Sequence, residues 1–277
     1  MNRSPKFVAF AVGALWMAVP ILRAQNTTSS KPVTVTSNGS IDDDTATVRD
    51  TAALNALLRM GNYLRGLNNI QIKAYVTTEE VLTDDEKIQT SSVVNLIAHR
   101  PDKLRITIDN EKRPRTLYYD GSTFTVWAPA PKFYGQVAAP PSINELARVL
   151  EDKYDIDLPL VDMFRWGTPE LSLDSLTSAR DIGPAKINDI TCEQYAFRQT
   201  GMDFQVWIQR GDYPLPLKVV LTTTDDDARP QHESVYQWNL APSFNDAAFT
   251  FTPPKDAQKI NLAEAAQSRL KKKETPR

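Results

Sequence analysis

The stretch Ile70-Gln71-Ile72-Lys73-Ala74-Tyr75-Val76-Thr77 decides the fold of this chain, because apolar and polar side chains alternate along it. That period is typical of a β-strand that packs one face against a core and turns the other to solvent. The same alternation recurs at Leu104-Arg105-Ile106-Thr107-Ile108 and at Phe204-Gln205-Val206-Trp207-Ile208. One period in three distant segments indicates a mainly β, antiparallel protein.

Around this stretch we expect about eleven strands, in two meanders separated by helices. A tight turn at Asp120-Gly121 joins two strands of the first meander, and no rhythm of alternating strands and helices indicates a parallel sheet. The first meander comprises residues 70–77, 87–99, 104–109, 115–120, 123–128 and 132–137. The second comprises a strand that begins near Leu176 and residues 191–199, 203–210, 215–224 and 231–240. Ala247–Phe251 is expected to form a last short strand.

The first ordered element is expected to be a helix over Asp50–Leu67. Asp50 can cap its start, Gly66 falls at its end, and leucines recur between them at helical spacing. The expected apolar face comprises Leu54, Leu57, Leu58, Leu64 and Leu67. A helix with one apolar face lies on another element, and here a sheet is expected beneath it.

Two short helices are expected to interrupt the sheet at mid-chain. Ser142–Tyr154 begins with a capping box of Ser142 and Glu145, and Pro159–Trp166 follows it. Helices this short draw their stability from tertiary contacts, which places them among the elements that open locally at low cost. We therefore predict that the two helices form a lid. Its apolar side chains are Leu146, Leu150, Leu160 and Phe164.

The N-terminus has the order of a secretory signal peptide over residues 1–24. Arg3 and Lys6 are basic, Phe7–Leu22 is an uncharged apolar run, and Ala24 is a small residue before a polar stretch. The run is short for a spanning helix, which needs about 20 residues, and an uncleaved membrane anchor is the alternative. We expect a periplasmic protein that is cleaved near Ala24 and meets the membrane only through this segment or through transient surface contact.

Beyond the signal peptide the chain divides into three expected parts. Residues 25–48 are rich in Thr, Ser, Asn and Asp and are expected to form a flexible leader. Residues 49–262 hold the expected strands and helices and are expected to form one domain. Residues 263–277 are a charged tail, in which Lys271-Lys272-Lys273 could touch anionic lipid, although a soluble tail is the simpler interpretation.

Composition narrows the classes of function. The 277 residues include 32 basic and 34 acidic ones, and this balance argues against nucleic acid, whose binding needs clustered Lys and Arg. The one cysteine, Cys192, lies in a strand-like stretch and is expected to be buried and inert. The two histidines, His99 and His232, stand at strand ends and are expected to be solvated.

The sequence does not indicate an enzyme. It shows no recognisable Ser/His/Asp triad, no zinc-ligand spacing and no Gly-rich phosphate loop. Neighbouring acids such as Glu79 and Glu80 point to opposite faces of a strand, so they would not converge on one substrate. We expect no catalytic residue, no metal and no cofactor.

Several segments together resemble a known pattern. The turn segment Tyr118–Phe124 comes early, and Trp238-Asn239-Leu240-Ala241-Pro242 leads to Phe249–Pro254 late in the chain. These segments resemble the superfamily of the outer-membrane lipoprotein carrier and the related periplasmic stress-sensor regulators. More closely, residues 51–262 resemble a bacterial family of predicted periplasmic proteins of unknown function, which the segment Phe164–Glu170 fits best.

This resemblance implies a strongly curved, incomplete β-barrel with helices covering its open face. In the carriers the concave apolar face holds lipid or acyl chains, which implies a ligand-binding face here. The expected ligand-binding residues are Ile72, Ala74, Val76, Leu104, Ile106, Ile108, Phe124, Val126, Phe204, Val206, Ile208, Tyr236 and Trp238.

Two functions are compatible with these observations. The leading hypothesis is an exported periplasmic binding protein that holds a lipid or other amphiphile in the concave face of the half-barrel. The alternative is an envelope protein-interaction or stress-sensor module, which has a protein partner and no small ligand. An enzyme would instead need polar side chains that converge in a cleft.

Overall fold

The computed structural model describes residues 48–166 and 173–264 of the chain. The expected signal peptide, almost all of the expected leader, most of the charged tail, and Gly167 with the three residues after it lie outside the described residues. No helix within the described ranges is long and apolar enough to cross a membrane.

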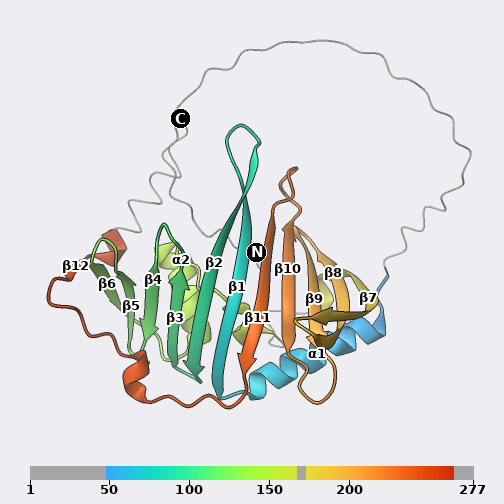
Figure 1. Cartoon of the computed structure of the whole chain (residues 1–277), viewed down its shortest axis with the longest axis horizontal. Coiled ribbons are helices and arrows are strands. Elements are labelled where there is room, and N and C mark those ends of the chain that lie inside the picture. The colour runs from blue at the N-terminus through green and yellow to red at the C-terminus, as the bar shows by residue number, and fades with distance from the viewer. Residues whose placement is uncertain (1–47, 167–172, 265–277) are drawn as a thin grey trace, which may run out of the picture.

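The described chain forms one twelve-stranded sheet with helices against it (Figure 1). The helices are α1 (Thr51–Gly66), α2 (Ile143–Tyr154) and α3 (Asp162–Arg165), with the 3-10 turns η2 (Leu173–Ser175) and η3 (Asp246–Phe249). The first six strands are β1 (Asn69–Val81), β2 (Lys87–His99), β3 (Lys103–Asp109), β4 (Arg115–Tyr119), β5 (Thr123–Ala128) and β6 (Phe133–Ala138). The others are β7 (Leu176–Ile187), β8 (Ile190–Gln199), β9 (Met202–Gln209), β10 (Pro216–Thr223), β11 (Gln231–Asn239) and β12 (Gln258–Ile260).

The order of the strands makes the sheet one open, curved surface. The order is β12-β6-β5-β4-β3-β2-β1-β11-β10-β9-β8-β7, so the first strand pairs with the eleventh at its centre. Every pair is antiparallel except that of β12 with β6. The sheet is not closed into a barrel. The expected fold class, a mainly β incomplete barrel, is confirmed, and the expected strand count is exceeded only by the three-residue β12.

The two faces of the sheet differ as the alternation predicts. Along β1, Ile70, Ile72, Ala74 and Val76 are buried, and the residues between them are exposed or half-buried. Ile72 lies opposite Leu96 of β2 and Trp238 of β11, and residues directly opposite in an antiparallel pair share a face. The apolar side chains of the neighbouring strands therefore gather on one face, where the helices also pack.

Helix α1 begins and ends where the sequence predicts. The Asp50 side chain accepts a hydrogen bond from the Ala52 backbone N–H at 2.7 Å. Its buried face includes Ala53, Ala56, Leu57, Met60 and Leu64. The assignment of Leu58 to this face is wrong, since 42% of the residue is exposed. Two alanines, Ala53 and Ala56, are buried on this face and were not expected there.

The mid-chain helices differ in how well they were predicted. Helix α2 has the expected bounds, and the Ser142 hydroxyl accepts from the Glu145 N–H at 3.3 Å. The third helix is shorter than the expected Pro159–Trp166, because α3 covers only four residues. Leu160 has a φ of 62°, and a left-handed residue interrupts the right-handed helix that was expected to run through it.

The C-terminal segment 240–264, here called the strap, runs from β11 along the lower ends of the strands and then up to the edge of the sheet at β6 (Figure 1). The expectation of a strand over Ala247–Phe251 is wrong, because η3 forms there and β12 lies farther along, parallel to β6. Phe251 packs against three aromatic rings at centroid distances of 5.2–5.6 Å, those of Tyr118, Trp127 and Tyr134. The strap is thus held mainly by the insertion of Phe251 among these rings, and its strand pairing with β6 is short.

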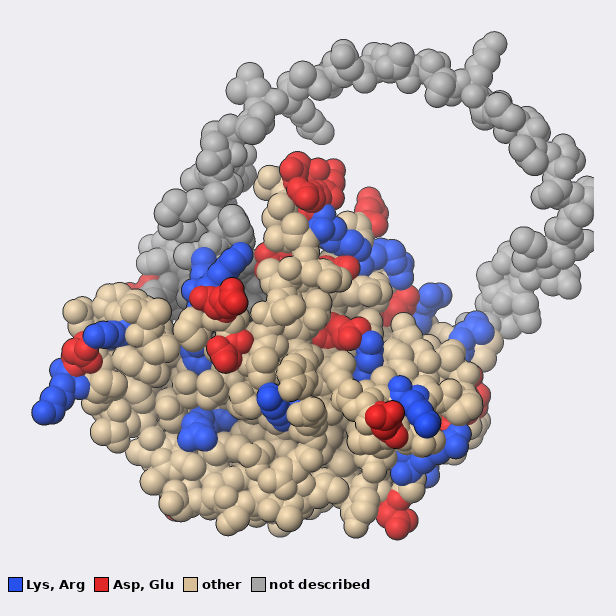
Figure 2. Space-filling model, in the orientation of Figure 1, with Lys and Arg blue, Asp and Glu red and all other residues tan. Residues whose placement is uncertain are grey.

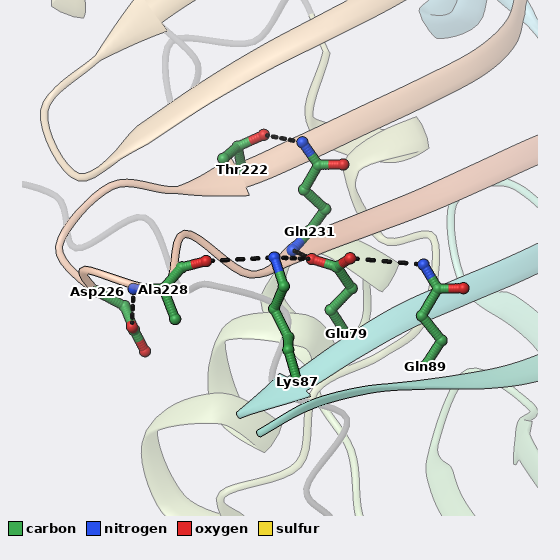
Figure 3. A network of polar contacts seen from close by, with 7 residues as sticks. All are labelled: Glu79, Lys87, Gln89, Thr222, Asp226, Ala228 and Gln231. Atoms are coloured by element: carbon green, nitrogen blue, oxygen red, sulfur yellow. Dashed lines mark hydrogen bonds and ion pairs between the residues drawn. The ribbon is translucent and has the colours of Figure 1, made fainter. Parts of the chain in front are cut away.

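A polar network ties together β1, β2 and the turn before β11 at the upper rim (Figure 3). Glu79 forms an ion pair with Lys87 at 3.0 Å and accepts from the Gln231 backbone N–H at 2.9 Å. Lys87 also donates to the Ala228 carbonyl at 3.3 Å. Above this rim, Figure 2 shows acidic side chains at the tip of the β1–β2 hairpin, while Lys and Arg are scattered over this face.

We predict that Phe249→Ala lowers the free energy of unfolding by about 3–5 kcal/mol, because Phe249 is 1% exposed and packs edge-to-face on Phe244. Urea unfolding followed by circular dichroism measures the change. Leu240→Ala, in the same strap at a residue that is 47% exposed, is the control and should stay within about 0.5 kcal/mol. Equal effects of the two variants would show that the strap is not part of the folded core.

Candidate functional site

All thirteen residues expected to bind ligand lie on the helix-covered face of the sheet and belong to one apolar cluster. Nine are buried, whereas Ile108, Val126, Phe204 and Trp238 are partly exposed. The four lid residues join the same cluster and are 0–4% exposed. The structure therefore brings the two expected sets together in one packed interior. Whether this interior takes up a ligand stays a prediction.

The interior is filled by the helices. The two best-defined pockets among the described residues have volumes of only about 30 Å³ each, which is room for about one or two water molecules. Both pockets lie along α3, one toward α2 and the other toward β10 and β11, and Asp162 lines both of them. An acyl chain could enter this face only if α3 moved.

A group of polar side chains lies on this face next to α3. Thr78 of β1 and His232 of β11 are direct cross-strand neighbours, and the Thr78 hydroxyl lies 2.9 Å from His232 Nδ1. The other ring nitrogen, Nε2, lies 3.2 Å from the Ser234 hydroxyl. The expectation of a solvated His232 is therefore wrong. Burial lowers the pKa of His232 to about 4, so the ring is neutral at physiological pH.

Asp162 and Tyr236 complete this group. Burial raises the pKa of Asp162 to about 6; the nearby Arg165 opposes that rise and Glu151 adds to it. Arg165 is itself within 3.5 Å of a Glu151 carboxylate oxygen. Burial also raises the pKa of the Tyr236 hydroxyl, while its hydrogen bond with Ser234 works against that rise.

Two buried donors close to α3 lack acceptors among the described residues. Trp166 is 8% exposed, packs edge-on against Phe204 at 6.1 Å, and its indole N–H has no hydrogen-bond partner. The Arg100 guanidinium lies over the ring of the lid residue Phe164 at 4.9 Å, and its Nε donates to the Leu67 carbonyl at 3.1 Å. Its Nη2 has no partner, and burial lowers the pKa of this guanidinium.

This arrangement suits binding better than catalysis. Ser234 and His232 lie within hydrogen-bond distance, but the second nitrogen of the ring faces the Thr78 hydroxyl where a triad has a carboxylate. An imidazole with a pKa of about 4 is also a weak general base at neutral pH. Elsewhere, Cys192 is fully buried, as expected, and burial raises the pKa of its thiol, which disfavours the reactive thiolate.

The polar group is the part of the site that sequence reasoning missed. Thr78 and Ser234 continue the inward registers of β1 and β11, but nothing local shows that these strands are neighbours. Asp162 and Trp166 flank a helix of four residues, which is too short to show a periodic face. Two of its members were singled out: Tyr236 was expected to bind ligand, and His232 was expected to be solvated.

An open antiparallel sheet whose helices fill its apolar face defines this molecule as a half-barrel protein. The chain belongs to the family described as Predicted periplasmic protein (DUF2092), whose model matches residues 53–263. This confirms the closer of the two resemblances drawn from the sequence, and it assigns the chain to a periplasmic family.

Solved structures with a similar fold come from several bacteria. Lipoprotein LppX of Mycobacterium tuberculosis is 10% identical with a TM-score of 0.45, over 71% of this chain and 100% of that chain. LprF of Mycobacterium bovis is 10% identical with a TM-score of 0.41, over 76% and 99%. A LolA superfamily protein of Nitrosomonas europaea is 9% identical with a TM-score of 0.34, over 72% and 97%. No curated protein matches the sequence.

The two titratable groups beside α3 give the stability of the fold opposite dependences on pH. The neutral ring of His232 gives its full contribution to the stability of the fold above pH 6.5, the ordinary pKa of histidine. This contribution is lost as the pH falls toward about 4, the pKa of the ring in the folded protein. Asp162 acts in reverse, because its pKa is raised from 3.8 to about 6. Its protonated form stabilises the fold fully below pH 3.8, and that contribution is lost as the pH rises through about 6.

We therefore predict opposite effects for two variants. His232→Gln should lessen the loss of stability between pH 6.5 and about 4, because no buried imidazole remains to be protonated. Asp162→Asn should raise stability at neutral pH, with a gain that disappears toward pH 3.8. Urea unfolding across this range measures both, with His99→Gln at an exposed histidine as the control. Variants that changed the pH profile in the same direction would contradict the assignment.

Proposed function

We propose that this chain is an exported periplasmic protein that binds an amphiphile between the concave face of its sheet and the lid formed by α2 and α3. One observation carries the proposal. The apolar face of an open sheet is covered, over part of its area, by a helix of only four residues, and the two best-defined pockets lie along that helix.

The closed position of such a lid and the position that admits a ligand should differ little in free energy. A four-residue helix has no stability of its own, because isolated helices need about 12–15 residues to be even marginally stable. Its closed position therefore depends on the burial of side chains such as Leu160 and Phe164. A ligand chain contributes about 0.8 kcal/mol for each methylene that it buries, so it can replace those contacts on the sheet.

Export is proposed on two grounds. Residues 1–24 have the charge and apolar pattern of a cleaved signal peptide, with cleavage near Ala24. The family to which the chain belongs is described as periplasmic. In the periplasm an amphiphile would come from the neighbouring membranes, and the protein would act without chemistry on its cargo.

The filled interior favours a second candidate function, an envelope protein-interaction module with no small ligand. Strand β7 is the last strand of the sheet, and the hairpin that it forms with β8 exposes Ile182 and Ile190 to 52% and 42%. Residues 48–50 already pair with this edge at Ala179, and an extended segment of a protein partner could add to the rest of it through backbone hydrogen bonds. The two candidates differ in what should change when an amphiphile is added.

Hydrogen exchange tests the proposal directly. Without ligand, we predict faster amide exchange in α2 and α3 than in the flanking strands, because short elements open locally at a lower free energy. Adding dodecan-1-ol or a non-ionic detergent monomer should change exchange in those two helices selectively. Helix α1 is the internal control, since it covers the same face with 16 residues and a capped start.

The contrary result is as clear. If every segment exchanged alike with and without amphiphile, and native mass spectrometry of protein from membrane extract showed no bound lipid, the amphiphile proposal would be wrong. A stoichiometric protein partner captured by wild-type chain, and lost when Ile182 and Ile190 are replaced by lysine, would then support the interaction module.

A further inference from the structure

We propose that the pocket between α3 and strands β10 and β11 is a head-group subsite for an uncharged, hydroxyl-bearing amphiphile. This inference rests on the proposed function, because it assumes that an acyl chain can occupy the neighbouring apolar face. The pocket is lined by Leu160, Asp162, Met163, Trp166, Val219, Leu221, His232, Ser234 and Tyr236. Its lining thus combines a continuous apolar wall with one small polar group.

The space available matches a small head group. The pocket volume of about 30 Å³ has room for about one or two water molecules, so a hydroxyl fits it once α3 shifts enough to uncover the Trp166 indole N–H, which is buried in the closed position. A phosphate or sugar head would need much more room. The apolar wall, which includes Val219 and Leu160, belongs to the same cluster as the concave face. A chain attached to the hydroxyl could therefore continue along that face.

The polar side chains of the pocket fall into two kinds. His232 and Ser234 are already hydrogen-bonded within the strands, the imidazole to Thr78 and Ser234, and Tyr236 is hydrogen-bonded to Ser234. The indole N–H of Trp166, by contrast, is buried and has no acceptor in the described part of the chain. A buried donor without an acceptor costs about 1–3 kcal/mol, so a ligand that supplies the acceptor recovers that cost.

Asp162 completes the recognition. Its carboxyl group accepts hydrogen bonds when ionised, and Trp166 can only donate. A hydroxyl is the smallest group that can accept from the indole N–H and donate to the carboxylate at the same time. The groups that face Asp162 are Arg165 on its own helix, Glu151 of α2 and Tyr236 of β11, so one cation and one further acid surround it.

The same residues argue against an anionic head group. None of the described residues that line this pocket is Lys or Arg, and His232 is neutral at physiological pH. Arg165 lines the other pocket, where it is paired with Glu151. A carboxylate ligand would therefore meet the Asp162 carboxylate without a cation between them, and like charges at short range repel strongly away from water.

Three probes with one chain length test this inference: dodecan-1-ol, its methyl ether and dodecanoate. Equilibrium dialysis against the full mature chain at about pH 8 gives the dissociation constants, with the alcohol and the ether below their solubility limits and dodecanoate below its micelle concentration. We expect the alcohol to bind about tenfold more tightly than dodecanoate, with the ether between them, since each hydrogen bond contributes about 0.5–1.5 kcal/mol. Asp162→Asn should improve the binding of dodecanoate.

Trp166→Phe should weaken the alcohol and the ether alike, about fivefold to tenfold, because the oxygen of each probe accepts from the indole N–H. Trp207→Phe is the matched control: Trp207 alternates with the inward Val206 and Ile208 and so lies on the other face of the sheet, with the Lys218 ammonium 5.2 Å from its ring. Circular dichroism and urea unfolding verify that both variants fold.

The outcomes separate this inference from the proposed function. If the alcohol, the ether and dodecanoate bind wild-type protein equally, or if Trp166→Phe and Trp207→Phe act alike, the head-group subsite is wrong while amphiphile binding stands. Tighter binding of dodecanoate would also overturn the subsite. If none of the probes binds, both the subsite and the proposed function fail.

Discussion

The antiparallel pairing of β1 with β11 is the constraint on which the rest of the structure depends. It runs from Gln71 opposite Asn239 to Thr78 opposite His232, and it joins two meanders that would otherwise be separate sheets. Closing so long a loop costs little more entropy than closing one half as long, because the cost rises only with the logarithm of loop length. The chain can therefore place five strands and two helices between β1 and the second meander without losing the pairing.

The positions of the helices and of the polar group follow from the pairing of β1 with β11. Once the two meanders form one curved surface, their inward apolar residues need a cover, and α1, α2 and α3 supply it from the same side. The pairing also sets Thr78 beside His232, so the polar group forms on the central seam of the sheet. Asp162 and Trp166 then approach that seam from α3, where the cover is thinnest. The candidate site thus lies where the paired strands β1 and β11 are covered by the four-residue helix α3.

The local alternation of residues was enough to predict the apolar side of this site, which the strands provide. Ile72, Ile106 and Val206 are inward because a strand alternates with a period of two, and that information lies within a few residues of each position. The bounds of α1 and α2 were predictable for the same reason, since Asp50 and Ser142 cap them from the adjacent position.

What escaped prediction depends on distant or irregular contacts. The backbone at Leu160 is left-handed, so the expected helix begins only at Asp162. The burial of His232 depends on a strand 154 residues away. The path of the strap depends on Phe251, which finds its three aromatic partners on β4, β5 and β6, and β12 has only three residues, all exposed, with no period to recognise.

The position of β12 has a consequence for the order in which the fold can be completed. A ribosome makes the chain from the N-terminus, so β1 to β6 exist as a meander before β11 has been made. During that interval β6 has an unpaired outer edge and Gly135 has not yet met Leu262, which packs on it in the finished fold. An unpaired edge invites pairing with other chains. The last strand among the described residues is therefore the one that protects the first meander, and a chain released or cut short before residue 258 would carry an open edge of the kind that seeds aggregation.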